Sequence, residues 1–120
     1  MFRPADVRRV QAAFDEGLDP PYDAQVQLEN MRKTMRVVIM DPDNPALPVG
    51  QAVWWFDENA HKGVKQPADA EIAAILGSLR KVCDEYPAFK AASAAEKAER
   101  DAREAANRAA READAAAQEA

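Results

Sequence analysis

The chain has 120 residues, a formal net charge of −5 and a single cysteine, Cys83. This length suits one ordinary domain. The charges are spread along the chain, which argues against a nucleic-acid binder, because such proteins need a clustered basic face. One cysteine excludes an internal disulfide and a zinc site built from several cysteines. We expect Cys83 to be a buried thiol on the apolar side of a helix.

No segment resembles a signal peptide, and none reaches the length of a transmembrane helix. We therefore expect a cytoplasmic protein with no membrane partner, or a virion protein if the chain comes from a phage. The frequent use of Ala, and of Arg over Lys, is typical of a GC-rich bacterial or bacteriophage genome.

The large apolar side chains end at Phe89, because the only apolar residue type in 91–120 is alanine. A core cannot form without large apolar side chains. We therefore predict a compact domain over residues 1–89 and an Ala-rich, charged helical extension over residues 90–120.

The first predicted element is a helix from about Ala5 to Glu16, in which Val7, Val10 and Phe14 form an apolar stripe. Pro4 suits the first helical position. We expect Gly17 to end this helix in the left-handed conformation that commonly follows a helix.

Three strands are expected next, at about 22–29, 34–40 and 50–56, with a proline-containing loop over Asp41–Pro48. The first strand alternates between apolar and polar residues, which is typical of a half-buried strand. The second is apolar on both faces and is predicted to be central. No crossover helix separates the strands, so we predict an antiparallel meander.

An amphipathic helix is predicted from about Pro67, and its apolar positions are Ile72, Ile75, Leu76, Leu79, Val82, Cys83 and Tyr86. Pro87 either kinks one long helix or separates two helices. The predicted fold is α+β: a small three-stranded antiparallel sheet packed with an N-terminal helix and an amphipathic helix, followed by a long Ala-rich C-terminal helix.

Alanines recur every three or four residues along the predicted C-terminal helix, in a stripe that runs from Ala91 to Ala120. One interpretation is a solvated helix maintained by helix propensity and by the ion pairs Glu96–Arg100, Glu99–Arg103 and Glu104–Arg108. The other is a seam for a partner helix or a second copy, as in a coiled coil. The candidate contact residues on this stripe are Ala95, Ala98, Ala102, Ala105 and Ala109.

Trp54 and Trp55 are adjacent in the third predicted strand and must point to opposite faces of the sheet. Trp54 shares its face with Phe56 and is the better core candidate. Trp55 is then covered by the N-terminal helix, by the C-terminal helix or by a partner protein. Exposed tryptophan is typical of binding hot spots, so Trp55 is a candidate partner-binding residue.

We find no motif for catalysis, for a cofactor or for a metal. His61 stands alone in a polar loop, without the partners that acid–base catalysis needs. Asp41–Asn44 resembles the start of a calcium loop but lacks the required glycine and final glutamate. We expect a protein that is not an enzyme.

These features favour a structural or assembly protein that acts through protein–protein contacts, including self-association through the C-terminal helix. In a bacteriophage, it would be a virion or assembly component. The alternative is a small acidic inhibitor or regulator, of the anti-defence type, whose Trp-bearing domain binds one host protein.

Overall fold

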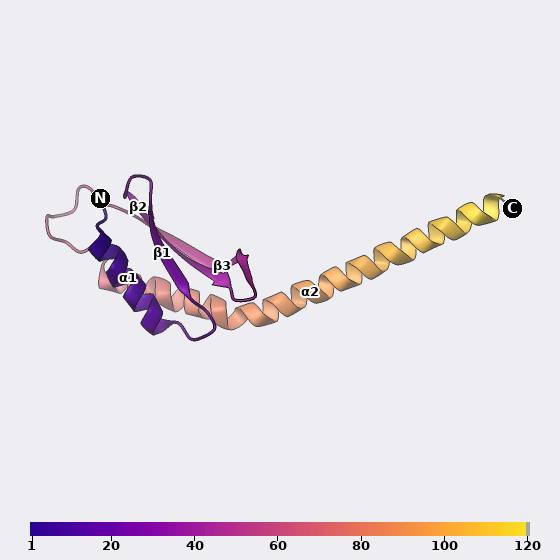
Figure 1. Ribbon diagram of the computed structural model, residues 1–120, viewed down its shortest axis with the longest axis horizontal. Coiled ribbons are helices and arrows are strands. Elements are labelled where there is room, and N and C mark those ends of the chain that lie inside the picture. The colour runs from indigo at the N-terminus through magenta and orange to yellow at the C-terminus, as the bar shows by residue number, and fades with distance from the viewer. Residues whose placement is uncertain (120) are drawn as a thin grey trace. The chain divides into compact units, whose positions relative to one another are not determined.

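A computed structural model describes residues 1–119. Its elements are α1 (Pro4–Gly17), β1 (Ala24–Glu29), β2 (Thr34–Asp41), β3 (Asn44–Trp55) and α2 (Asp69–Glu119) (Figure 1). The predicted α+β fold is confirmed. The chain divides into two compact units, Met1–Glu85 and Tyr86–Ala120.

The sheet has the order β1-β2-β3 with both pairs antiparallel, so β2 is the central strand, as predicted. In the turn between β1 and β2, Asn30, Met31 and Arg32 all have positive φ angles, of 51°, 56° and 66°. Asparagine is among the residues that adopt this conformation most readily.

The loop predicted over Asp41–Pro48 is wrong for most of its length, because β3 already begins at Asn44. Only Pro42 and Asp43 form the turn, and the Asp41 carboxylate accepts a 2.8 Å hydrogen bond from the Asp43 N–H. Prolines are tolerated here because β3 is an edge strand, and the β2–β3 register is irregular on either side of Met40.

The core lies on one face of the sheet, where α1 and residues 69–85 of α2 pack. Phe14 and Val10 of α1, Val37 and Met35 of β2, and Phe2 are fully buried. The Phe2 ring meets Phe56 edge to face, with ring centroids 5.3 Å apart. The sequence pattern did not identify Phe2, because it precedes the first helix and belongs to no periodic stripe.

The predicted role of Gly17 is wrong. Gly17 is the last residue of α1, and the following cap, Leu18, is extended, with φ −96° and ψ 139°. A Cβ atom at Gly17 would overlap the Leu76 side chain of α2. The glycine therefore leaves room for the Leu76 side chain where α1 lies beside α2, and it does not form a left-handed turn.

Helix α2 is continuous through Pro87. Ile72, Leu79 and Cys83 are buried as predicted, but Val82 is 39% exposed. Val82 lies beside Gly50 of the edge strand β3, where the sheet ends and cannot cover it.

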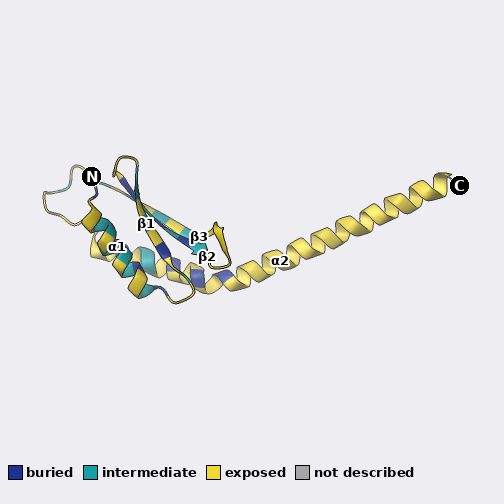
Figure 2. Cartoon of the chain, in the orientation of Figure 1, coloured by how far each residue is buried: buried dark blue, intermediate teal, exposed yellow. Residues whose placement is uncertain are grey.

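Every described residue from 87 to 119 is exposed, whereas the buried residues lie earlier in the chain (Figure 2). One of the predicted ion pairs, Glu99–Arg103, is present at 3.7 Å. No helix within residues 1–119 combines the length and the apolar character needed to cross a membrane.

The burial of Phe14 gives a test of the core. Phe14→Ala should lower the free energy of unfolding by about 3–5 kcal/mol, because it removes a fully buried ring and leaves a cavity. The matched control is Phe89→Ala, since Phe89 is 66% exposed and its loss should cost below about 0.5 kcal/mol. Urea denaturation followed by circular dichroism measures both, and equal effects would contradict this core.

Candidate protein-interaction surface

The second face of the sheet, here called the open face, lies opposite α1 and residues 69–85 of α2. Side chains alternate between the two faces of each strand, so the register determines which residues belong to it. From β1 to β3 the open face consists of Gln25, Gln27, Glu29, Thr34, Arg36, Val38, Met40, Gln51, Val53 and Trp55.

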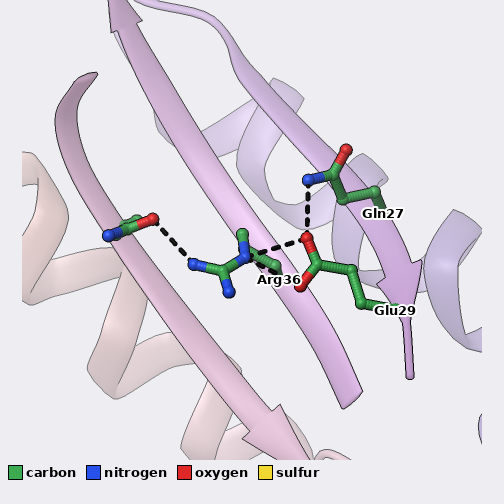
Figure 3. Close-up of polar contacts among 4 residues, drawn as sticks. Gln27, Glu29 and Arg36 are labelled. Carbon is green, nitrogen blue, oxygen red and sulfur yellow. Dashed lines mark hydrogen bonds and ion pairs between the residues drawn. The ribbon is translucent and has the colours of Figure 1, made fainter. Parts of the chain in front are cut away.

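Arg36 occupies the middle of this face and joins all three strands (Figure 3). Its Nε lies 3.0 and 3.1 Å from the two carboxylate oxygens of Glu29 on β1. Its Nη1 donates to the side-chain oxygen of Gln51 on β3, at 2.9 Å. Gln27 donates to the same Glu29 carboxylate, at 3.0 Å.

This network neutralises the charges at the centre of the open face. The Arg36 and Glu29 side chains are about one third exposed, at 31% and 37%, so solvent screens their attraction and the pair adds at most about 1 kcal/mol. Its more important effect is to fix the relative register of three strands, since each contact requires the side chains to be opposite or diagonal.

Trp55 lies at the β3 side of the open face and is 71% exposed. Covering by the N-terminal helix, one of the expected possibilities, is therefore wrong, because α1 packs against the opposite face. Val53, on the same face of the same strand, is 36% exposed. Trp54 points to the other face and packs partly buried against the core, as predicted.

The first part of the outer edge of β1 is covered by a side chain of α1. The Gln11 amide donates to the Ala24 carbonyl at 2.8 Å and accepts from the Val26 N–H at 3.0 Å. The side-chain amide thus replaces a neighbouring strand along the part of β1 that would otherwise be unpaired.

The outer edge of β3 has no such cover. The Phe56 N–H donates to the Lys33 carbonyl, and backbone groups alternate in direction along a strand. The backbone groups of Ala52 and Trp54 therefore point toward β2, whereas the N–H and C=O groups of Gln51, Val53 and Trp55 point outward. Among residues 1–119, no hydrogen bond reaches these outward backbone groups. The β3 edge, defined as Gly50–Trp55, is therefore unpaired and adjoins the exposed Val53 and Trp55 side chains.

The other singled-out residues lie apart from this surface. His61 is exposed in the loop before α2, where a shallow cleft of about 520 Å³ is lined by Arg3, Asp6 and residues 56–58 and 60–66. Among the described residues, no group of three or more His, Cys, Asp or Glu side chains is arranged to hold a metal ion. Asp41 is 2% exposed and stabilises the turn before β3.

Ala95, Ala98, Ala102, Ala105 and Ala109 are all exposed on α2, and their role as contact residues stays a prediction. Ala120, the last alanine of the stripe, lies outside the described residues. Sequence reasoning also missed Gln11 and the Arg36 network. The alternation of side chains along β2 could have placed Arg36 on the same face as Val38. No sequence signal links Gln11 to β1.

Comparison with protein-family models, with curated proteins and with solved structures found no match for this chain.

Exposure of Trp55 can be measured directly. In a Trp54→Phe variant in dilute solution, Trp55 should emit close to free tryptophan and be quenched readily by acrylamide. In the matched Trp55→Phe variant, the half-buried Trp54 should emit at shorter wavelength and be quenched severalfold less. A blue-shifted, poorly quenched Trp55 would contradict the open face described above.

Cys83 gives a prediction about pH. Burial, and secondarily the neighbouring Asp84 carboxylate, raise the pKa of the Cys83 thiol above its ordinary value of 9.0. A folded pKa above the unfolded one adds stability below that unfolded value, and this stability is lost as the pH rises through the folded pKa. As the pH rises above about 9, the unfolding free energy should therefore fall more steeply in the unaltered chain than in Cys83→Ala. Parallel slopes in urea titrations would refute a buried, neutral thiol.

Proposed function

We propose that this protein is a non-enzymatic structural or assembly protein that acts through protein–protein contacts. The observation that carries the proposal is the exposure of Trp55, at 71%, beside the unpaired β3 edge. Tryptophan is enriched among the few residues that dominate interface energies, and an unpaired strand offers backbone hydrogen bonds to a partner. Both features meet on one small surface.

The C-terminal helix supplies the second part of the proposal. α2 extends to Glu119 and offers an exposed alanine stripe over its later turns. Small side chains allow two helices to approach closely, so we place a partner helix, or a second α2, against Ala98, Ala102 and Ala105. In a bacteriophage, such a protein would serve as a virion component or assembly accessory in the infected cytoplasm.

A small acidic inhibitor or regulator, binding one host protein, is the second candidate. It is favoured by the position of Trp55 in the unit Met1–Glu85, since a binding surface built there does not need the alanine stripe. The two candidates differ in whether the stripe takes part in binding.

Point variants of the full chain test the proposal. Trp55→Ser should weaken binding to a co-purified partner at least tenfold, which corresponds to about 1.4 kcal/mol, because it removes a large exposed ring. Its matched control is Gln25→Ser, on the same face at the opposite edge. Affinity capture from the native host, followed by titration of the purified pair, provides the measurement.

Ala105→Glu tests the stripe, and Asn107→Glu is its control, because it adds the same charge on another side of the helix. An assembly protein should lose binding in both Trp55→Ser and Ala105→Glu. An inhibitor should lose it in Trp55→Ser alone and bind its target one to one. A chain whose contacts survive all of these changes would refute the proposed function.

A further inference from the structure

We propose that the β3 edge pairs antiparallel with the β3 edge of a second copy, so that two three-stranded sheets join into one across a two-fold axis. This inference rests on the proposed function and names the partner of the same surface. It follows from which edge is protected, from the side chains along the unprotected edge, and from the register in which that edge can meet itself.

The two edges of the sheet are treated differently. On β1, Gln11 occupies the outward carbonyl of Ala24 and the outward N–H of Val26. On β3, the first half carries Pro45 and Pro48, which cannot donate to an added strand, and it adjoins the irregular register near Met40. Natural proteins use such devices against unwanted strand pairing. They stop at Gly50.

From Gly50 to Trp55 the strand reads GQAVWW, with no proline and no charged residue. Lysine and other charges are the usual protection of an edge, and their absence leaves a strand that two copies can bring together without charge repulsion. The nearest charge on the open face, Arg36, is already paired with Glu29. A neutral edge offers nothing to a partner selected by charge, which favours a second copy of the same strand.

In an antiparallel pair of edges, residues whose backbone N–H and C=O groups point outward from one strand must lie opposite such residues of the other strand. If Val53 meets Val53 of the second copy, Gln51 meets Trp55, and all three outward residues of each strand are paired. This register therefore satisfies every outward group of the edge and is symmetric, as a two-fold interface must be. A shift by one residue would oppose outward groups to inward ones.

Apolar side chains flank the edge on both faces of the sheet. On the open face these are Val53 and Trp55, 36% and 71% exposed, and on the helix face Val82 of α2 lies beside Gly50 and is 39% exposed. Pairing of the edges brings the two Val53 side chains into contact and places each Trp55 ring over the partner's Gln51. The same step thus satisfies backbone groups and covers apolar surface.

Sedimentation equilibrium of the full chain over a wide concentration range tests the proposal. We expect a reversible dimer whose association strengthens with added salt, because the two chains carry −5 each and salt screens their repulsion. Val53→Lys should raise the dissociation constant at least tenfold, since it places two like charges at the two-fold axis. Gln25→Lys, which adds the same charge at the closed edge, should change it less than twofold.

Disulfide trapping tests the register. In a Cys83→Ala background, Val53→Cys should form a dimer on mild oxidation, because Cα atoms of a hydrogen-bonded antiparallel pair lie about 5.5 Å apart, within disulfide range. Gln25→Cys is the control and should remain monomeric.

A chain that is monomeric at the highest concentration, with no trapping through residue 53, overturns the inference. So does a dimer that persists in Val53→Lys and dissociates in Ala105→Glu, because the alanine stripe would then hold the two copies. Either result leaves the proposed function standing if a foreign partner still depends on Trp55. If binding of the foreign partner does not depend on Trp55, the proposed function is refuted, whereas the sedimentation and trapping results still decide the dimer.

Discussion

The structure depends on a shortage of large apolar side chains. All of them lie within residues 1–89, and this supply is enough to cover one face of a three-stranded sheet but not two. α1 and residues 69–85 of α2 both pack on the same face, against Met35, Val37 and Ile39 of the central strand. The second face must therefore be stabilised without a hydrophobic layer, and its side chains show how this is done.

On that face, hydrogen bonds and an ion pair replace burial. Arg36 sits on the central strand, from which a long side chain can reach both neighbours, Glu29 and Gln51. The network contributes little free energy because it is partly exposed, but it allows only one register. The network does not include Val53 and Trp55 on the β3 side, where the side chains are apolar and the backbone edge is unpaired. The same shortage that leaves this face open thus leaves two exposed apolar side chains, Val53 and Trp55, at its β3 border.

Sequence periodicity was sufficient for the elements whose side chains alternate or repeat regularly. It located α1, β1, β2 and the start of α2 to within a few residues, and it identified Trp54 as the core tryptophan. It failed where position in the sheet decides the outcome. Pro45 and Pro48 read as a loop because proline breaks internal strands, but an edge strand tolerates them. Gly17 and Gln11 act on partners distant in sequence, Leu76 and Ala24, and no local pattern reports such contacts.

The C-terminal turns of α2 obey a different constraint from the rest of the chain. Residues 87–119 bury nothing, so their helix relies on alanine propensity and on pairs such as Glu99–Arg103. Each such pair contributes only a few tenths of a kcal/mol, so this segment tolerates substitution at most surface positions without loss of the helix. A seam of Ala98, Ala102 and Ala105 is correspondingly weak alone, since alanine buries little area.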